Sequence, residues 1–278
     1  MKTITRKSLL YRTGVEYSDF CLNHVQGCSH GCKYPCYAFM MKKRCGVVKT
    51  YEEWIEPKIV ENALELLDVE IPKYKKDINY VHMCFSTDPF MFEQDEVSEL
   101  SLQIMDKLNS NDIPCSTLTK GVYPKELAKR NGKSKNNKYG ITLVSLDEEF
   151  RKKYEPKTAT FKERIKSLKN LHDSGFQTWV SMEPYPTPNF IKQNLKEVLD
   201  AVGFVDKIVF GRMNYNAVVS EFKFNKEYYN SLSSYFVKFC KENEIGYHVK
   251  EGTKTPKVEQ KYSKRAEIKQ MVAEFSPV

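Results

Sequence analysis

Short apolar runs alternate along the chain with segments in which apolar residues recur every three or four positions. Such runs, bounded by turn residues, predict buried strands, and the three-to-four spacing predicts helices that pack by one face. The predicted strands are Phe20–Val25, Ile78–Phe85, Ile113–Leu118, Tyr139–Val144, Phe176–Met182, Lys207–Phe210 and Gly246–Val249. The predicted helices are Glu56–Leu67, Val97–Asn109, Lys125–Arg130, Phe161–Ser174, Phe190–Val202 and Lys226–Glu244.

This alternation predicts an α/β fold of parallel strands joined by helical crossovers, with functional groups at the carboxyl ends of the strands. Six such units favour a partial (β/α)6 TIM-like barrel, and a doubly wound open sheet is the alternative. We expect one core domain over residues 1–250. The charged segment 251–278, which contains Pro256, is expected to form a tail or flap, and Asn131–Lys138 an exposed loop.

No apolar run reaches the length of a signal peptide or a membrane span, so we expect a cytoplasmic protein without membrane contact. In a reducing compartment, eight cysteines are not expected to form four disulfides. Scattered cysteines are then small core residues, and clustered ones are metal ligands or reactive thiols. The scattered set is Cys84, Cys115 and Cys240. The clustered set is Cys21, Cys28, Cys32, Cys36 and Cys45.

The net charge of +8 would suit a partner that carries phosphates. The 36 acidic residues are interleaved with the basic ones along the chain, which favours a lysine-rich solvated surface instead.

Three thiols, those of Cys28, Cys32 and Cys36, lie within nine residues of one another. They follow closely after the first predicted strand. Gly27 and Gly31 permit the backbone of a tight loop around an iron-sulfur cluster. Three ligands for four irons leave one iron open to a substrate or cofactor. The alternative is a structural zinc site, which needs a fourth ligand. That ligand would come from Cys21, Cys45, His24 or His30.

The segment Gly27–Ala38 resembles the signature loop of radical S-adenosylmethionine (SAM) enzymes, and Asn23–Cys32 resembles the spore photoproduct lyase-like branch of that family. The family pattern has three and then two residues between the cysteines, whereas this chain has three and three, through Pro35. Proline has no N–H to offer the adenine. The resemblance therefore leaves the aromatic contact with the cofactor to Tyr34 or Tyr37.

Later segments resemble the same branch at successive strand ends. Ser86, Thr87 and Asp88 stand where family members hold the amino group of SAM. Lys120 and Ser145 end the next two strands, where the family presents polar groups to the cofactor. Arg164, which follows Glu155-Pro156, could pair with the cofactor carboxylate, or it could be a charge on the helix surface.

Polar residues after the fifth and sixth strands are the substrate-side candidates, since these strand ends should line the reaction mouth. They are Glu183, Arg212, Asn214 and Tyr215. We expect Met40 and Met41 to be packing residues. His82, His172 and His248 are expected to be hydrogen-bonded or surface residues and not ligands.

The resemblance implies a [4Fe-4S] cluster on Cys28, Cys32 and Cys36 that cleaves SAM reductively. The resulting 5'-deoxyadenosyl radical takes hydrogen from a substrate. It also implies an electron donor of the flavodoxin or ferredoxin type. The substrate is unknown, and nucleic acid is among the candidates. The alternative function is a nucleic-acid-binding module stabilised by zinc or an iron-sulfur cluster, without catalysis.

Overall fold

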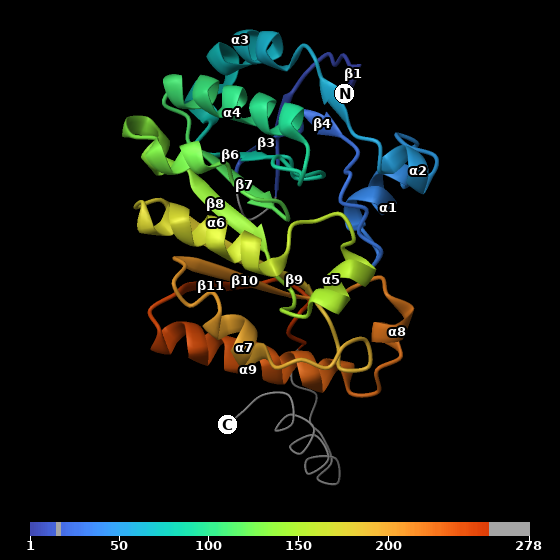
Figure 1. Ribbon diagram of the computed structural model, residues 1–278. Helices are drawn as coiled ribbons and strands as arrows, with labels where there is room; N and C mark the ends of the chain where they lie inside the picture. The colour runs from blue at the N-terminus through green and yellow to red at the C-terminus, as the bar shows by residue number, and fades with distance from the viewer. Residues whose placement is uncertain (15–17, 256–278) are drawn as a thin grey trace. The chain divides into compact units, whose positions relative to one another are not determined.

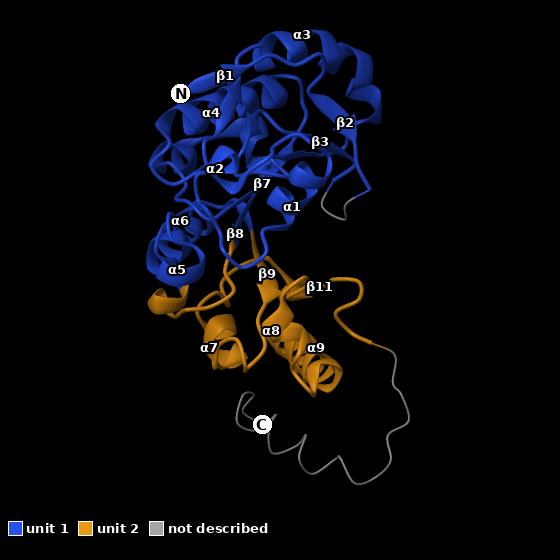
Figure 2. Ribbon diagram, turned by 90° about the vertical axis from the view of Figure 1, so that its right-hand side faces the viewer, with its two compact units in different colours: residues 1–141, 151–178 blue, residues 142–150, 179–278 orange. Residues whose placement is uncertain are grey.

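The computed structural model describes residues 1–14 and 18–255, which form a mixed α/β fold (Figure 1). The chain divides into two compact units (Figure 2). Unit 1 comprises residues 1–141 and 151–178, and unit 2 comprises residues 142–150 and the described part of 179–278. Among the described residues, no helix combines the length and the apolar character that crossing a bilayer requires.

Unit 1 contains a largely parallel sheet with the strand order β2-β3-β6-β7-β8. Strand β3 pairs antiparallel with β2 and parallel with β6, and β6, β7 and β8 continue in parallel. The strands are β2 (Leu10–Arg12), β3 (Phe20–Leu22), β6 (Val81–Met83), β7 (Cys115–Thr119) and β8 (Lys138–Thr142). A second sheet has the order β1-β5-β4 and consists of β1 (Lys2–Ile4), β5 (Lys58–Val60) and β4 (Val25–Gln26).

The helices of unit 1 follow local sequence signals. In α4, Val97, Ser101, Ile104, Met105 and Leu108 are buried, which is the spacing of one helix face. A capping box starts α6, because Thr160 and Glu163 each accept a hydrogen bond from the other's backbone N–H. The helices are α1 (Tyr37–Arg44), α2 (Tyr51–Trp54), α3 (Ala63–Tyr74), α4 (Asp95–Ser110) and α6 (Phe161–Asp173). Helix α5 (Glu148–Tyr154) crosses the boundary between the units.

Unit 2 is built on three parallel strands, in the order β9 (Gln177–Tyr185), β10 (Lys207–Arg212) and β11 (Gly246–Val249). Helices α7 (Leu195–Asp200), α8 (Ala217–Ser220) and α9 (Asn225–Glu242) accompany them. Helix α9 packs on β10 and β11. The ring of Phe210 stacks on that of Phe236 at 5.2 Å between centroids, so that α9 covers the centre of this sheet.

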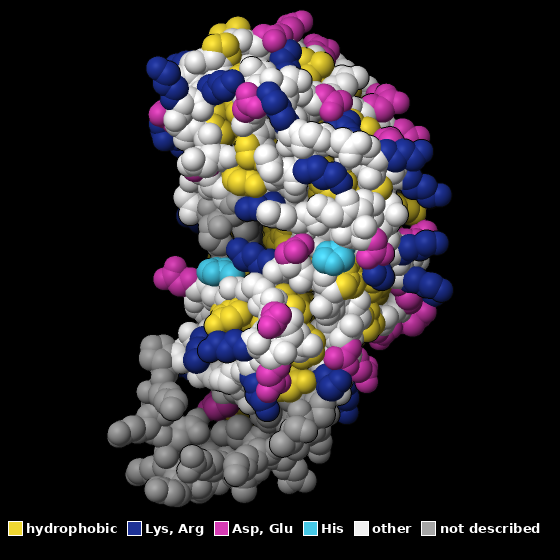
Figure 3. Space-filling model, turned by 90° about the vertical axis from the view of Figure 1, so that its left-hand side faces the viewer, with side chains coloured by type: hydrophobic (Ala, Val, Ile, Leu, Met, Phe, Trp, Pro, Cys, Tyr) yellow, Lys and Arg dark blue, Asp and Glu magenta, His cyan; other side chains and the backbone are white. Residues whose placement is uncertain are grey.

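All seven predicted strands are present, and they lie in the parallel arrangement that was predicted. The scattered cysteines are buried, as expected. Lys, Arg, Asp and Glu side chains are intermixed over the face seen in Figure 3, which agrees with an interleaved charged surface.

Several helix predictions were wrong. Residues 58–60 of the predicted helix Glu56–Leu67 form β5, which pairs with the distant β1, and α3 begins only at Ala63. Lys125–Lys129 is a 3-10 helix. The predicted helix Phe190–Val202 is confined to Leu195–Asp200, where the Asn194 side chain caps its start. Helix α1 was not predicted, since none of its residues is fully buried.

The predicted exposed loop Asn131–Lys138 is partly internal. It contains a 3-10 helix at Gly132–Asn136, and Asn137 is 0% exposed. The Asn137 side chain exchanges two hydrogen bonds with Asn109, of 3.0 and 2.9 Å, and accepts the Cys115 backbone N–H at 2.9 Å. One amide thus joins this loop to α4 and to the start of β7, because the buried polar groups there need partners.

We expect Asn137→Ala to lower the free energy of unfolding by about 2 kcal/mol, because it leaves the Cys115 N–H and the Asn109 amide buried without partners. Urea unfolding followed by circular dichroism measures the change. The matched control is Asn136→Ala, whose side chain is exposed one residue earlier. Equal stability of the two variants would show that the amide pair does not support the fold.

Candidate active site

The loop that carries the three clustered cysteines has the backbone that its glycines allow. Gly27 has φ +89° and Gly31 has φ +60°, as the sequence predicted. A Cβ on Gly27 would lie 2.7 Å from the Trp54 carbonyl oxygen, which accepts the Cys28 N–H at 2.8 Å. The Tyr51 hydroxyl donates to the Gly31 carbonyl at 2.6 Å. Two residues of α2, Tyr51 and Trp54, therefore hydrogen-bond to the backbone of the cysteine loop.

Cys28, Cys32 and Cys36 are half-buried free thiols. Burial raises the pKa of Cys28, and the neighbouring charges of Asp88, Cys32 and Cys36 raise it further. Burial also raises the pKa of Cys32 to about 12, although the nearby Lys120 ammonium opposes this. The three thiols are thus close enough to influence one another, and a cation would favour their thiolate forms.

In the described part of the chain, no three His, Cys, Asp or Glu side chains meet as ligands for a single metal ion. In a [4Fe-4S] cluster, each cysteine binds a different iron. The set of three sulfur donors beside a lysine fits such a cluster chemically, because thiolates are its usual ligands.

Asp88 joins three loops of unit 1. Its carboxylate accepts the Phe90 N–H at 2.9 Å, the Thr119 hydroxyl at 2.7 Å and the Lys120 N–H at 2.8 Å. His30 Nδ1, from the cysteine loop, lies 3.4 Å from the same carboxylate, while its Nε2 accepts the Phe92 N–H at 2.9 Å. Burial lowers the pKa of His30 to about 4, so the neutral ring donates from Nδ1.

The turn after β7 lies against the Phe90 backbone. A Cβ on Gly121 would lie 1.8 Å from the Phe90 carbonyl oxygen, so only glycine fits there. The Gly121 N–H donates to the Thr119 hydroxyl at 2.7 Å. The two strand-end loops that meet at Asp88 are therefore in backbone contact.

A second buried carboxylate, Glu155, lies beside the cysteine loop. Arg164 Nη2 donates to it at 2.6 Å, and both side chains are 0% exposed. The Tyr34 hydroxyl also donates to Glu155, and Lys120 Nζ lies 4.0 Å from it. Burial alone would raise the pKa of Glu155, but the charges of Arg164 and Lys120 outweigh burial and lower it.

The charged side chains around Glu155 also lie near the cysteines. Burial alone would lower the pKa of Lys120, but the charges of Cys32 and Glu155 outweigh burial and raise it. The Lys120 ammonium also lies 5.7 Å from the centroid of the Tyr34 ring. Lys120 and Arg164 thus place two cations near the thiols, where the carboxylates of Glu155 and Asp88 balance them.

The remaining cofactor candidates lie on different elements. Ser86 and Thr87 are half-buried after β6, and the Ser86 hydroxyl and N–H both donate to the Asn23 side chain at 3.0 Å. Tyr37 is 50% exposed on α1. Ser145 is buried in unit 2, where its hydroxyl accepts the Asp147 N–H at 3.1 Å. The alternative that Arg164 is a surface charge was wrong, since Arg164 is fully buried.

The four substrate-side candidates lie in unit 2, at the ends of β9 and β10. Glu183 faces Lys250 at 3.6 Å. Arg212 Nε is buried and has no hydrogen-bond partner among the described residues. Asn214 and Tyr215 are exposed, and Tyr215 has the unusual φ of +59°.

The sequence indicated no supporting role for His30, Glu155 or Tyr51, which all hold the cysteine loop. The sequence signals that could have indicated this role were the position of His30 inside the cysteine motif and that of Glu155 in a segment that resembles the family. The histidines weighed as zinc ligands have other partners: His24 Nε2 lies 2.7 Å from the Ser101 hydroxyl, and His30 contacts Asp88. Met40 and Met41 are 38% and 39% exposed, so the prediction that they pack internally was wrong.

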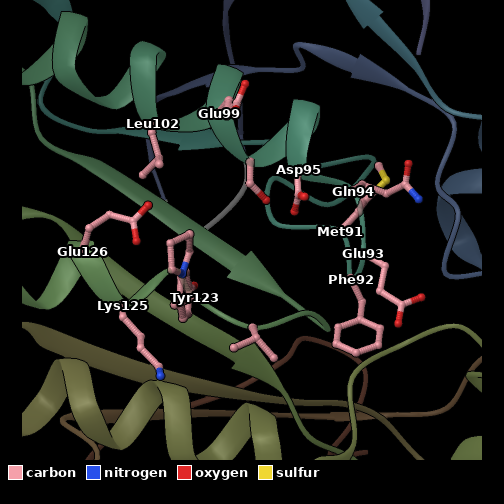
Figure 4. Close-up of a pocket in the computed structure, with 13 residues that line it drawn as sticks. Met91, Phe92, Glu93, Gln94, Asp95, Glu99, Leu102, Tyr123, Lys125 and Glu126 are labelled. Carbon is pink, nitrogen blue, oxygen red and sulfur yellow. The ribbon is translucent and has the colours of Figure 1, made fainter.

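Unit 1 also contains a cavity of about 570 Å³ between the start of α4 and the segment after β7 (Figure 4). Its lining residues include Met91 and Tyr123 and the acidic residues Glu93, Asp95 and Glu126. None of the residues predicted to hold the cofactor lines this cavity. Met91 nevertheless belongs to the core cluster against which Cys28 packs, and its sulfur accepts a hydrogen bond from the Ser29 hydroxyl at 3.7 Å, so a residue of the cavity wall contacts the cysteine loop.

The family model described as "Radical SAM superfamily" matches residues 22–202, which is more than half of the chain. The chain therefore belongs to the radical SAM superfamily. The match begins at the end of β3 and includes the cysteine loop, Asp88, Lys120, Glu155 and Arg164.

Two kinds of relative are similar over most of the chain. Uncharacterized protein ORF301 of Acidianus two-tailed virus is 25% identical over 245 residues, which cover 82% of this chain and 77% of the viral protein. A structure of spore photoproduct lyase complexed with dinucleoside spore photoproduct has a TM-score of 0.61 at 12% identity, covering 88% of this chain and 80% of the lyase. A lyase variant with bound AdoMet and the same dinucleoside has a TM-score of 0.63, with the same identity and coverage.

These findings confirm the TIM-like α/β fold of the radical SAM enzymes and the family that the sequence resembled. Members of this family are enzymes that use a [4Fe-4S] cluster and SAM, and they generally need an electron donor. The alternative of a non-catalytic, metal-stabilised module is therefore overturned.

We expect Arg164→Met to destabilise the apoprotein by about 3 kcal/mol, because the buried Glu155 carboxylate keeps only the Tyr34 hydroxyl and the more distant Lys120 ammonium as partners. Thermal and urea unfolding of the metal-free protein measure this loss without any contribution from a cofactor.

The double variant Glu155→Gln/Arg164→Met is the control, because it removes both charges of the pair. It should recover at least half of the lost stability. If it is as unstable as Arg164→Met, packing of the arginine stem and not charge pairing holds this region.

Proposed function

We propose that Cys28, Cys32 and Cys36 hold a [4Fe-4S] cluster with which the enzyme cleaves SAM reductively. When bound and reduced, the cluster supplies the electron that breaks a carbon–sulfur bond of SAM, and the radical product takes hydrogen from a substrate. The observation that carries the proposal is that three mutually interacting thiols lie together beside the Lys120 ammonium.

The residues around the thiols divide into two groups. Asp88 and His30 are positioning residues, since four donors already surround the Asp88 carboxylate and tie the cysteine loop to two strand ends. Glu155 and Arg164 are also buried and paired. The Ser86 and Thr87 hydroxyls and the Lys120 ammonium are the groups we assign to SAM, because they are less enclosed and suit its amino and carboxylate groups.

Tyr37 is the stronger candidate for the adenine, because the Tyr34 hydroxyl is committed to Glu155. Ser145 remains a proposed cofactor contact.

We assign the substrate to Glu183, Arg212, Asn214 and Tyr215. The buried Arg212 Nε without a partner among the described residues supports a substrate with hydrogen-bond acceptors. The substrate itself is unassigned, and nucleic acid is one candidate.

After anaerobic reconstitution, each of Cys28→Ala, Cys32→Ala and Cys36→Ala should lose the visible absorbance of the cluster, because three thiolates are the proposed ligands. Cys45→Ala is the matched control, since Cys45 is exposed at the end of α1 and should leave iron and sulfide content unchanged. A full-occupancy cluster in the Cys32→Ala protein would refute the ligand assignment.

The reconstituted wild-type protein, reduced with dithionite, should slowly release 5'-deoxyadenosine and methionine from SAM. Lys120→Met should keep its iron content but form product at least about tenfold more slowly, because one charge-assisted contact to the cofactor is lost. Chromatography of the products measures both. Product at the level of a cluster-free control, even with candidate substrates present, would overturn the proposed cleavage.

A further inference from the structure

Helix α1 has an unusual distribution of side chains. Its inner side packs on α2, where the Phe39 ring lies 5.7 Å from the ring of Tyr51 and 6.1 Å from that of Trp54. Its outer side carries Met40, Met41 and Arg44, which share one helix face by their spacing. None of its residues is fully buried. The helix therefore presents apolar side chains to solvent.

The exposed apolar residues are concentrated at this place. Met40, Met41 and Val47 are 38%, 39% and 38% exposed. They are three of the twelve exposed large hydrophobic residues in the described ranges 1–14 and 18–255, yet they lie within eight positions of one another. The Val47 N–H donates to the Lys42 carbonyl at 2.9 Å, so Val47 folds back against the end of α1. A grouped apolar patch of this kind indicates an interaction site.

The segment that carries this patch is basic, and the nearest acidic residues in sequence are Glu52 and Glu53 on the adjacent α2, where Glu53 accepts the Lys49 backbone N–H. Residues 20–51 contain five Lys or Arg residues and no Asp or Glu, although the chain has 36 acidic residues. Lys33, Lys43, Arg44 and Lys49 are exposed, and their side chains form no ion pair with the described part of the chain. The face seen in Figure 3, by contrast, mixes both signs. We call Met40, Met41 and Val47 with these four cations the α1 surface.

The α1 surface is also next to the cysteine loop. Cys36, a proposed cluster ligand, is the N-cap of α1, and Tyr37 follows it. Eight helical residues span about 12 Å at 1.5 Å per residue, so a protein bound along α1 would lie close to the cluster. Helices α1 and α2 lie together at the edge of unit 1 (Figures 1 and 2).

We propose that the α1 surface docks an acidic electron-transfer protein that reduces the cluster. The inference rests on the proposed function. One electron passes from the reduced flavin or iron-sulfur centre of that protein to the cluster, and no bond forms or breaks. An apolar centre with a charged rim is the usual anatomy of a protein interface, whereas exposed Met and Val offer nothing to the phosphates of a nucleic acid.

The test uses the reconstituted holoenzyme and an acidic flavodoxin. Lys43→Glu/Arg44→Glu should weaken binding at least about tenfold at low salt, by calorimetry, and slow reduction of the cluster by reduced flavodoxin, by stopped-flow absorbance. The difference should shrink in about 0.5 M salt, where charges are screened within about 4 Å. Met40→Ser/Met41→Ser should weaken binding at both salt concentrations, because it removes apolar contact.

Lys73→Glu/Lys76→Glu is the matched control, since it makes the same change of net charge on exposed lysines of unit 1 beyond α1. It should bind flavodoxin like wild type. Equal loss in both charge variants, or a preference of the α1 surface for a DNA oligonucleotide over flavodoxin, would overturn the proposal.

Dithionite separates this proposal from the proposed function, because it reduces the cluster without docking. SAM cleavage with dithionite should be unchanged in the α1 variants. If dithionite supports cleavage but the α1 variants bind flavodoxin normally, the docking surface is wrong and the cleavage stands. If dithionite supports no cleavage in wild type, the proposed function itself has failed.

Discussion

The structure of unit 1 depends on the neutralisation of one buried carboxylate. Glu155 has no exposed surface, and an unpaired carboxylate there would be strongly unfavourable. Its partners come from three segments, namely Tyr34 in the cysteine loop, Lys120 after β7 and Arg164 on α6. The ion pair therefore brings together the parts of the chain around the thiols, and it determines where Lys120 can place its charge.

Asp88 connects backbone segments of unit 1, as Glu155 connects its charged side chains. It binds the N–H groups of two strand-end loops and faces the neutral His30 of the cysteine loop. Most of the polar groups expected to contact a cofactor thus contact the protein itself. The direct contacts that we propose come from a few half-buried hydroxyls and one ammonium, which this internal network holds in place.

The strands were predictable because their apolar runs are buried within a sheet, and the cysteine loop because three thiols so close together in sequence favour a shared metal centre. The failures have physical causes. Residues 58–60 became β5 by pairing with β1, and a distant partner leaves no periodic trace in the sequence. Helix α1 lacks a buried face. Asp88 and Arg164 were recognised as important, but sequence cannot tell whether a polar side chain faces a ligand or the interior.

The tight approach at Gly121 restricts how this enzyme could be re-engineered. The loop after β6 and the turn after β7 touch through backbone atoms, so no side chain on either can be trimmed to make room for a change in the other. Libraries that diversify one segment alone would accumulate misfolded members. Residues 88–92 and 119–123 would therefore have to be transplanted or randomised together.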